Sequence, residues 1–241
     1  MEVTKRLDSL PGCGYSIWQD AKEFCFTTDA VFLAAFPHLV TKAKVLELGS
    51  GTGAMSLLLS ARGAGHVVGV DCNEKVVELF RQSILENKLS GSVEAIGADL
   101  RELKSLYASE TFDLVVANPP YRIGGKRRKI GTAACHELTA TLEDFFQVAS
   151  YMTKYRGRFA LVQLPERFTQ AISLGAKYGL ELKKLQWVHS FVEKPAWIFL
   201  AEFVKGGAPG LEVLPPLIMY NKDGTHSNQT LAYYGIDRED K

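Results

Sequence analysis

The chain has 241 residues, of which 46% are hydrophobic and 23% charged, and its formal net charge is +1. A chain of this length and composition can bury a full core, which excludes a disordered or fibrous protein. Because the overall charge is close to zero, it neither favours nor excludes a nucleic-acid partner. Clusters of charge along the chain are more informative about such a partner.

The beginning of the chain and its cysteines indicate the compartment. Residues 1–9 contain no apolar segment of the kind that a secretory signal requires, and the longest apolar stretch, 30–40, is too short for a membrane span. The four cysteines form no Cys-x-x-Cys pair, and no histidine lies at zinc-ligand spacing. We therefore expect a cytoplasmic protein without a membrane anchor, disulfides or a metal site, and a monomer is favoured.

Apolar segments alternate with helical patterns along most of the chain. Strands are predicted at 44–48, 66–71, 92–98, 112–117, 158–164, 182–189 and 196–204. Helices are predicted between them at 54–62, 74–87, 101–107, 142–154 and 166–177. Such alternation is typical of a doubly wound parallel sheet. The last two strands have no helix between them, so the expected fold is α/β, with a mostly parallel seven-stranded sheet and an antiparallel hairpin at its edge.

The first predicted strand runs into a loop that contains Gly49, Gly51 and Gly53, and Glu47 lies two residues before the first of these glycines. Glycines let a ligand approach the backbone where a Cβ would clash. The loop also fits the dinucleotide fingerprint, because Asp71 follows the next strand at about the usual distance of ~20 residues. A nicotinamide enzyme is therefore an alternative at this point.

Further acidic residues at strand ends favour a different ligand. Asp71 is placed to bind ribose hydroxyls, and Asp99, at the end of the third strand, suits the exocyclic amine of a bound adenine. Each aspartate could also cap the helix that follows it. Because ligands of open α/β sheets bind outside the carboxyl ends of the strands, such a convergence is what a binding site predicts. Together with Glu47, it counts against the nicotinamide enzyme.

The fourth strand ends in Asn118-Pro119-Pro120-Tyr121, a turn that points to methylation of an amino nitrogen. An exocyclic amine is a poor nucleophile until it is pushed toward tetrahedral geometry. The Asn118 side-chain oxygen and the Pro119 carbonyl can each accept one N–H, and these bonds strengthen as the nitrogen becomes positive. Tyr121 can stack on a flat substrate, and because stacking needs only the ring, we expect Tyr121→Phe to retain much of the activity. The alternative is an ordinary Asn-Pro turn.

A basic segment follows this turn. Arg122, Lys126, Arg127, Arg128 and Lys129 lie within eight positions that contain no acid. Basic residues at the mouth of a site are what contacts with RNA phosphates need. Three further basic residues are candidates to extend this surface: Lys154, Arg156 and Arg158. The alternative is a solvated loop without a ligand.

With these motifs, the sequence resembles the class I S-adenosylmethionine-dependent methyltransferases with an Asn-Pro-Pro-Tyr motif. The resemblance is closest to the bacterial tRNA1(Val) adenine-N6 methyltransferases, which modify the adenosine just 3′ of the anticodon. It implies a Rossmann-like methyltransferase fold, with Asn118 and Tyr121 holding the target adenine. It also implies S-adenosylmethionine as cofactor, bound by Phe26, Thr28, Glu47, Gly49, Gly51, Gly53, Asp71, Asp99 and Asn118.

The resemblance covers nearly the whole chain and divides it into three parts. We expect an N-terminal segment, 1–43, whose helix covers the cofactor site, a catalytic domain, 44–205, and a C-terminal extension, 206–241. The sequence departs from the family's pattern at Cys135 and at 194–197, which lie away from the amine clamp. These departures concern the RNA-contacting surface and leave methyl transfer untouched.

The expected function is therefore transfer of a methyl group to the N6 amine of an adenine in tRNA. Glutamine-N5 methylation of a protein uses the same clamp, but that group carries a helical N-terminal domain, and about 43 residues precede the first predicted strand here. Guanine-N2 methylation of rRNA and adenine methylation of DNA are further enzymatic alternatives. From another class, an RNA-binding module that merely retains the fold is the last alternative.

Overall fold

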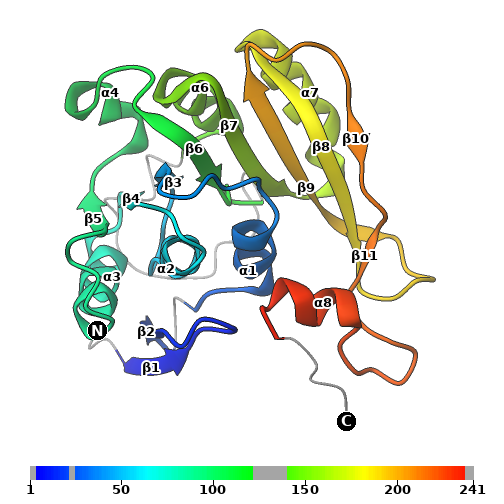
Figure 1. Ribbon diagram of the computed structural model, residues 1–241, viewed down its shortest axis with the longest axis horizontal. Helices are drawn as coiled ribbons and strands as arrows, with labels where there is room; N and C mark the ends of the chain where they lie inside the picture. The colour runs from blue at the N-terminus through cyan, green and yellow to red at the C-terminus, as the bar shows by residue number, and fades with distance from the viewer. Residues whose placement is uncertain (1–3, 22–24, 122–139, 237–241) are drawn as a thin grey trace.

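A central β-sheet organises the computed structural model, which describes residues 4–21, 25–121 and 140–236 (Figure 1). The sheet has nine strands in the order β10-β8-β9-β7-β6-β3-β4-β5, with β11 paired to β8. The strands are β3 Lys44–Leu48, β4 His66–Asp71, β5 Val93–Gly97, β6 Phe112–Ala117, β7 Thr153–Gln163, β8 Leu180–His189, β9 Ala196–Lys205, β10 Glu212–Val213 and β11 Leu217–Ile218.

The pairing of the strands confirms the predicted α/β fold. β3 pairs in parallel with β4 on one side and with β6 on the other, and β7 continues the parallel order beyond β6. β9 is antiparallel to both β7 and β8, which is the predicted edge hairpin. The seven predicted strands are all present, and two strands of two residues each, β10 and β11, lengthen the sheet at the β8 edge.

Helices cover both faces of the sheet, and each face has its own apolar core (Figure 1). One face is covered by α1 Thr28–Ala35, α2 Ala54–Ala61 and α3 Glu74–Glu86. The other is covered by η1 Leu100–Glu102, α4 Leu103–Leu106, α6 Leu142–Met152, η2 Pro165–Arg167 and α7 Phe168–Lys177. A capping box starts α6, because Thr141 accepts the N–H of Asp144 while the Asp144 carboxylate accepts that of Thr141. It fixes the start of α6.

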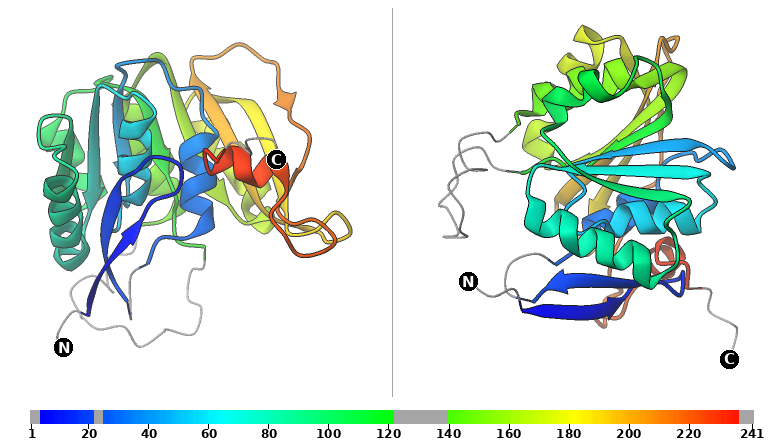
Figure 2. Two further views of the ribbon diagram at one scale, coloured as in Figure 1. Left: turned by 60° about the horizontal axis from the view of Figure 1, so that its bottom comes forward. Right: turned by 90° about the vertical axis from the view of Figure 1, so that its left-hand side faces the viewer.

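The N-terminal part contains a hairpin that the sequence patterns did not reveal. β1 Lys5–Ser9 pairs antiparallel with β2 Ser16–Asp20, and the hairpin lies beside α3 (Figure 2). The Trp18 N–H donates to the Ser83 hydroxyl of α3 at 2.9 Å. The helix that the sequence predicted within residues 1–43 corresponds to α1.

The C-terminal part returns along the sheet edge to the N-terminal helix. After β10 and β11, helix α8 Asn228–Tyr233 packs against α1 (Figure 1). The Phe32 ring of α1 meets the Tyr233 ring edge-on at 5.6 Å between centroids and stacks with that of Tyr234 at 6.0 Å. These aromatic contacts close the core under α1.

None of the helices within the described ranges is long and apolar enough to cross a membrane. The residues described also include no group of three or more His, Cys, Asp or Glu side chains that could hold a metal ion.

Candidate active site

The candidate site lies at the carboxyl ends of β3 and β6. The chain runs outward from β3 through β4 to β5 and then returns to β6 on the other side of β3, so the sheet order reverses between β3 and β6. Such a switch point is where open α/β sheets bind ligands. Two adjoining cavities, of about 220 and 270 Å³, meet there, and Gly49 and Asn118 line both.

The glycine loop after β3 leaves its backbone accessible. Gly49 and Gly51 have φ angles of 73° and 53°, in the left-handed region that favours glycine. Among the described residues, a Cβ added to Gly49 would meet only the Phe145 ring, at 3.8 Å, and one added to Gly51 would meet nothing within 4 Å. The loop is held from below, since the N–H groups of Gly49 and Ser50 both donate to the carbonyl of Val70. A ligand can therefore approach this backbone closely.

Gly53 has a different role from the other two glycines. It is the residue before α2, with a φ of 86°, and a Cβ there would lie 2.0 Å from the Phe80 ring. Gly53 does not line either cavity among the residues that the structure describes. The structure thus gives Gly53 a packing role, and its predicted contact with a cofactor stays a prediction.

Asp71 joins the glycine loop to the end of β4. Its carboxylate oxygens accept the N–H groups of Gly51 and Asn73, each at 2.9 Å. Asn73, and not Asp71, caps α3 with its side chain. Burial raises the pKa of the Asp71 carboxyl above its ordinary value, and the two backbone hydrogen bonds partly offset this effect. Asp71 lines the smaller cavity, and its carboxylate oxygens have lone pairs that these two hydrogen bonds do not use.

Asp99 lies at the candidate site and also caps a short helix, and its predicted contact with an adenine stays a prediction. It lines the smaller cavity at the end of β5. It also caps η1, because its carboxylate accepts the Arg101 N–H at 2.9 Å and pairs with the Arg101 guanidinium. These bonds hold the pKa of Asp99 below its ordinary value, so its carboxylate is charged where it faces the cavity.

Glu47 is a buried carboxyl on the wall of the larger cavity, and only 3% of its surface is exposed. The Ser56 hydroxyl donates to it, and it takes part in no ion pair within the described part of the chain. Burial is the main reason that its pKa rises from 4.5 to about 8, and the nearby Asp71 adds to the rise. A buried carboxyl of this kind is suited to a ligand that brings a positive charge.

A further part of the wall of the larger cavity comes from the segment before α1 and from the first turn of that helix. Phe26, Thr27 and Ala30 line the cavity there, and the Phe26 N–H donates to the Gln19 side chain at 2.6 Å. Thr28 starts α1, but among the described residues it does not line the cavity, whereas its neighbour Thr27 does. Thr27 therefore lines the cavity where Thr28 was expected, and the predicted covering of a cofactor site by this segment stays a prediction.

The Asn-Pro-Pro-Tyr turn presents its residues to different surroundings. Asn118 lines both cavities, and the exposed Pro120 lines the smaller one. Pro119 is buried, and its carbonyl accepts the Gln163 side-chain amide of β7 at 3.4 Å. Tyr121 is half-buried against the core on the α1 side, and its hydroxyl donates to the Asp29 carboxylate.

The Asp29 contact changes the expectation for Tyr121. Sequence reasoning treated the ring as the only functional part, so Tyr121→Phe was expected to be mild. In the structure the hydroxyl has a buried carboxylate as partner, and Asp29 is 5% exposed. Burial, followed by the charge of Asp29, raises the pKa of the Tyr121 phenol, so the hydroxyl stays a donor. Removing it would leave the Asp29 carboxylate without this bond.

Several cavity residues escaped the sequence analysis, and Phe145 of α6 matters most among them. Its ring is 3% exposed, lines the smaller cavity and faces Gly49. In the sequence, its position one helical turn after the Thr141 cap indicates a buried residue near the start of α6. Other lining residues carry little chemistry of their own: Val70, Cys72, Ala98, Leu100, Ala140, Met55, Ala54, Thr52 and Cys25.

The basic residues divide into two groups. Arg122 and Lys126, Arg127, Arg128 and Lys129 lie outside the described residues. The proposed extension of this surface is contradicted, because the start of β7 lies beside the start of β6, at the opposite edge of the sheet from Asn118. The basic residues there have local partners: Lys154 pairs with Asp113, Arg158 with Glu202, and Arg156 donates to the Gly206 carbonyl.

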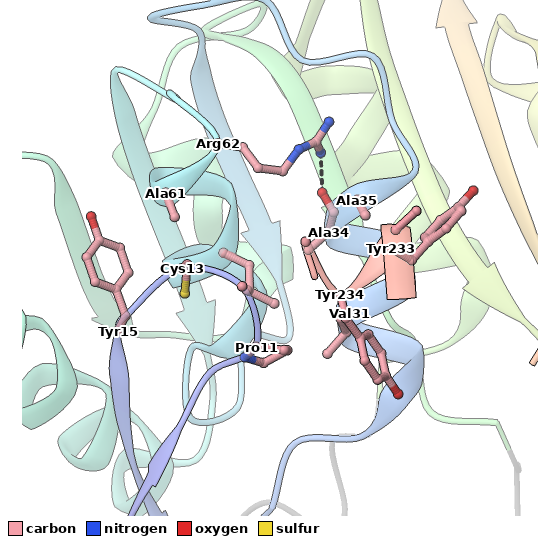
Figure 3. A pocket seen from close by; sticks show the side chains of 14 residues that line it. Pro11, Cys13, Tyr15, Val31, Ala34, Ala35, Ala61, Arg62, Tyr233 and Tyr234 are labelled. Atoms are coloured by element: carbon pink, nitrogen blue, oxygen red, sulfur yellow. Dashed lines mark hydrogen bonds between the residues drawn. The ribbon is translucent and has the colours of Figure 1, made fainter. Parts of the chain in front are cut away.

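A more spacious cavity, of about 520 Å³, lies elsewhere, between the β1–β2 hairpin, α1, α2 and α8. Figure 3 shows Arg62 at its rim, with the guanidinium turned toward the Ala34 carbonyl near the end of α1. The guanidinium also donates to the Pro37 carbonyl at 3.2 Å, so Arg62 satisfies one carbonyl of the last turn of α1 and one just beyond the helix. Among the described residues that line this cavity, none is a predicted site residue.

Comparisons with known proteins show the family of this chain. A family model described as a methyltransferase domain matches residues 39–188, so the chain belongs to the methyltransferase domain family. The tRNA1(Val) (adenine(37)-N6)-methyltransferase of Photobacterium profundum is 24% identical over 230 residues, which cover 92% of this chain and 90% of that protein. The enzyme of the same name from Porphyromonas gingivalis is 28% identical over 185 residues, with 73% and 72% covered.

Solved structures show the same fold. A predicted O-methyltransferase from Agrobacterium tumefaciens has a TM-score of 0.70 at 20% identity, covering 86% of this chain and 95% of its own. A T. thermophilus 16S rRNA N2 methyltransferase, solved with AdoMet and guanosine, has a TM-score of 0.60 at 22% identity, with 83% and 50% covered. Both similarities concern the fold.

Proposed function

We propose that this chain transfers a methyl group from S-adenosylmethionine to the exocyclic N6 amine of an adenine in tRNA, the adenosine 3′ of the anticodon of tRNA(Val). The observation that carries the proposal is the position of Asn118, which lines both cavities at the switch point of the sheet. The names of the relatives in Photobacterium profundum and Porphyromonas gingivalis support adenine and tRNA as the acceptor.

The residues of the larger cavity fit the methionine half of this cofactor. Glu47 is a buried carboxyl without a cation partner in the described part of the chain, and the cofactor's ammonium group would supply one. Phe26 and the backbone of Gly49 and Gly51 would enclose the same half. Thr28 and Gly53 would not contact the cofactor with side chains. They would fix the backbone at the starts of α1 and α2, and so hold the neighbouring residues that line the cavity.

The smaller cavity fits the adenosine half. Asp71 would accept the ribose hydroxyls, because each oxygen has lone pairs left beyond its backbone hydrogen bond. Asp99 would accept the exocyclic amine of the cofactor's adenine, and Phe145 offers an aromatic surface for the ring. When bound, S-adenosylmethionine supplies an electrophilic methyl group on its sulfonium sulfur.

The Asn-Pro-Pro-Tyr turn would hold and activate the target amine. The Asn118 side-chain oxygen would accept one N–H of the amine. The Pro119 carbonyl has one donor, Gln163, at 3.4 Å, and its second lone pair is available for the other N–H. Both bonds strengthen as positive charge develops on nitrogen, so they favour the transition state over the ground state. No general base is required.

Further parts of the chain complete the proposal. Arg122 and the basic residues 126–129 would contact phosphates of the tRNA next to Tyr121, against which the splayed base would stack. The segments 1–43 and 206–241 would flank a catalytic domain at 44–205. We propose that the enzyme acts as a monomer in the cytoplasm.

A competition for the acceptor tests the proposal. The protein and labelled S-adenosylmethionine are incubated with unmodified bulk tRNA, a ribosomal RNA fragment and a glutamine-containing peptide, and the digested products are identified by mass spectrometry. We expect N6-methyladenosine from tRNA(Val), at the position 3′ of the anticodon. Methylguanosine or methylglutamine as the main product would overturn the choice of acceptor. Failure to bind the cofactor would favour an RNA-binding module.

A further inference from the structure

The buried Asp29 carboxylate is not used by the proposed reaction. It lies in the first turn of α1 and is 5% exposed. Within the described part of the chain it belongs to no ion pair, and the Tyr121 hydroxyl donates to it across 92 positions of sequence. A buried carboxylate is costly unless donors satisfy it. The hydroxyl and the positive end of α1 are what satisfy this one.

The segment that contains Asp29 also forms a wall of the larger cavity. Phe26, Thr27 and Ala30 line that cavity together with Glu47, and Ala30 directly follows Asp29. A ligand in the larger cavity therefore touches the same short segment that holds the Tyr121 hydroxyl. The two contacts lie on adjacent residues of one helical turn.

The other side of the turn is fixed by β7. Gln163 is fully buried, its amide nitrogen donates to the Pro119 carbonyl at 3.4 Å, and its amide oxygen accepts the Leu164 N–H at 2.8 Å. The Asn-Pro-Pro-Tyr turn is thus held between Gln163 on one side and Asp29 on the other. Of these two contacts, only the one with Asp29 comes from a segment that lines the larger cavity.

We propose that Asp29 is a positioning residue that, through the Tyr121 hydroxyl, sets the turn's geometry and ties it to the wall formed by Phe26, Thr27 and Ala30. The inference rests on the proposed methyl transfer. The target nitrogen has to lie about 3–3.5 Å from the methyl group, and a displacement of about 1 Å can cost about 10²-fold in rate. A hydrogen bond that fixes the Tyr121 ring therefore affects the rate without touching the reacting atoms.

The test is a double-mutant cycle on single-turnover methyl transfer to unmodified tRNA. Asp29→Leu removes the acceptor and keeps a side chain branched at Cγ, Tyr121→Phe removes the donor, and the double variant removes both. Asp29→Asn keeps an acceptor oxygen, and Asp113→Asn, on an acid at the opposite edge of the sheet, is the matched control. Calorimetry with S-adenosylhomocysteine measures the affinity of each variant for the cofactor product.

We expect Asp29→Leu and Tyr121→Phe each to lower the single-turnover rate by about 10–100-fold. The double variant should be no slower than the slower single variant by more than about 3-fold, because both changes remove one interaction. Asp29→Asn should recover most of the rate, and affinity for S-adenosylhomocysteine should stay within about 3-fold throughout. If Asp29→Leu does not fold, the single-turnover rate of Tyr121→Phe tests the proposal.

Rate losses that multiply in the double variant, or a Tyr121→Phe variant as fast as the parent, would overturn the inference while the proposed function stands. Equal loss of S-adenosylhomocysteine binding and of rate would also overturn it, because Asp29 would then act on the cofactor and not on the turn. A parent that transfers no methyl group to any tRNA would overturn the proposed function, and this inference with it.

Discussion

At the scale of single residues, Glu47 shows how burial prepares a group for its ligand. Its pKa rises from 4.5 to about 8, so the folded protein without a ligand holds a proton there at neutral pH. The stabilisation that comes from this proton is complete below about pH 4.5 and is lost as the pH rises through about 8. A ligand with an ammonium group would reverse the preference and favour the carboxylate.

Binding of S-adenosylhomocysteine at pH 7 should therefore release a proton from Glu47. Calorimetry in buffers of different ionisation enthalpy measures this release directly. In Glu47→Gln the release should disappear and the affinity should fall, while Glu94→Gln, on an exposed glutamate of β5, should behave as the parent. Equal proton release by parent and Glu47→Gln would contradict the role given to Glu47.

Asp71 makes a second prediction at this scale. Asp71→Ala should weaken binding of S-adenosylmethionine by about 1.5–3 kcal/mol, since it removes a charged acceptor for the ribose hydroxyls. The substitution also removes the support of the Gly51 N–H, so the loop itself should loosen. Calorimetry decides, and a variant that binds as tightly as the parent would show that the ribose lies elsewhere.

At the scale of elements, the start of α2 depends on a glycine for packing. Gly53→Ala should lower the free energy of unfolding by at least about 2 kcal/mol, because its φ is 86° and the new Cβ would lie 2.0 Å from the Phe80 ring. Gly63→Ala is the matched control, with a φ of 96° but nothing within 4 Å of its Cβ. Denaturant unfolding should show a clearly larger loss for Gly53→Ala, and equal losses would rule out the clash with Phe80.

Elements with a strong local pattern could be predicted from the sequence to the residue. β3, β4 and β6 have the predicted bounds, because each is an apolar run bounded by loop residues. The hairpin of β1 and β2 was missed, since charged residues hide its alternation and α3 supplies its packing. β7 starts at Thr153, five positions earlier than predicted, because its first part is irregular around Arg156, whose φ is 64°.

The part of the candidate site that follows directly from strand positions could also be predicted from the sequence. Asp71, Asp99 and Asn118 follow strands, and the carboxyl ends of parallel strands meet at one edge of a sheet. Asp29 and Gln163 could not be found, because their partners in the turn lie 92 and 44 positions away in sequence. Only the folded chain brings those residues to the turn.

At the scale of the whole molecule, the edge of the sheet that holds Asn118 is expected to face the RNA. Replacing Lys126, Arg127, Arg128 and Lys129 by alanine should weaken tRNA binding and reduce the log–log salt slope by roughly 0.7–0.9 for each lost phosphate contact. Filter binding over a salt series measures this slope. Affinity for S-adenosylhomocysteine should not change.

Four basic residues at the opposite edge provide a charge-matched control: Lys44, Lys154, Arg156 and Lys205. Their replacement by alanine changes the net charge by the same amount but should leave the salt slope unaltered. If both sets of substitutions lowered the slope equally, tRNA binding would depend on overall charge and not on a defined face.

Single-turnover transfer of labelled methyl to tRNA(Val) by the parent and by Asn118→Ala tests the central claim most directly. The parent should place the label on the N6 amine of the adenosine 3′ of the anticodon. Asn118→Ala should lower the rate by about 10²–10³-fold, because it removes a preorganised acceptor of developing charge. Its affinity for S-adenosylhomocysteine should stay within a few-fold of the parent. Substantial transfer by Asn118→Ala, or loss of rate and cofactor affinity in equal measure, would contradict the account.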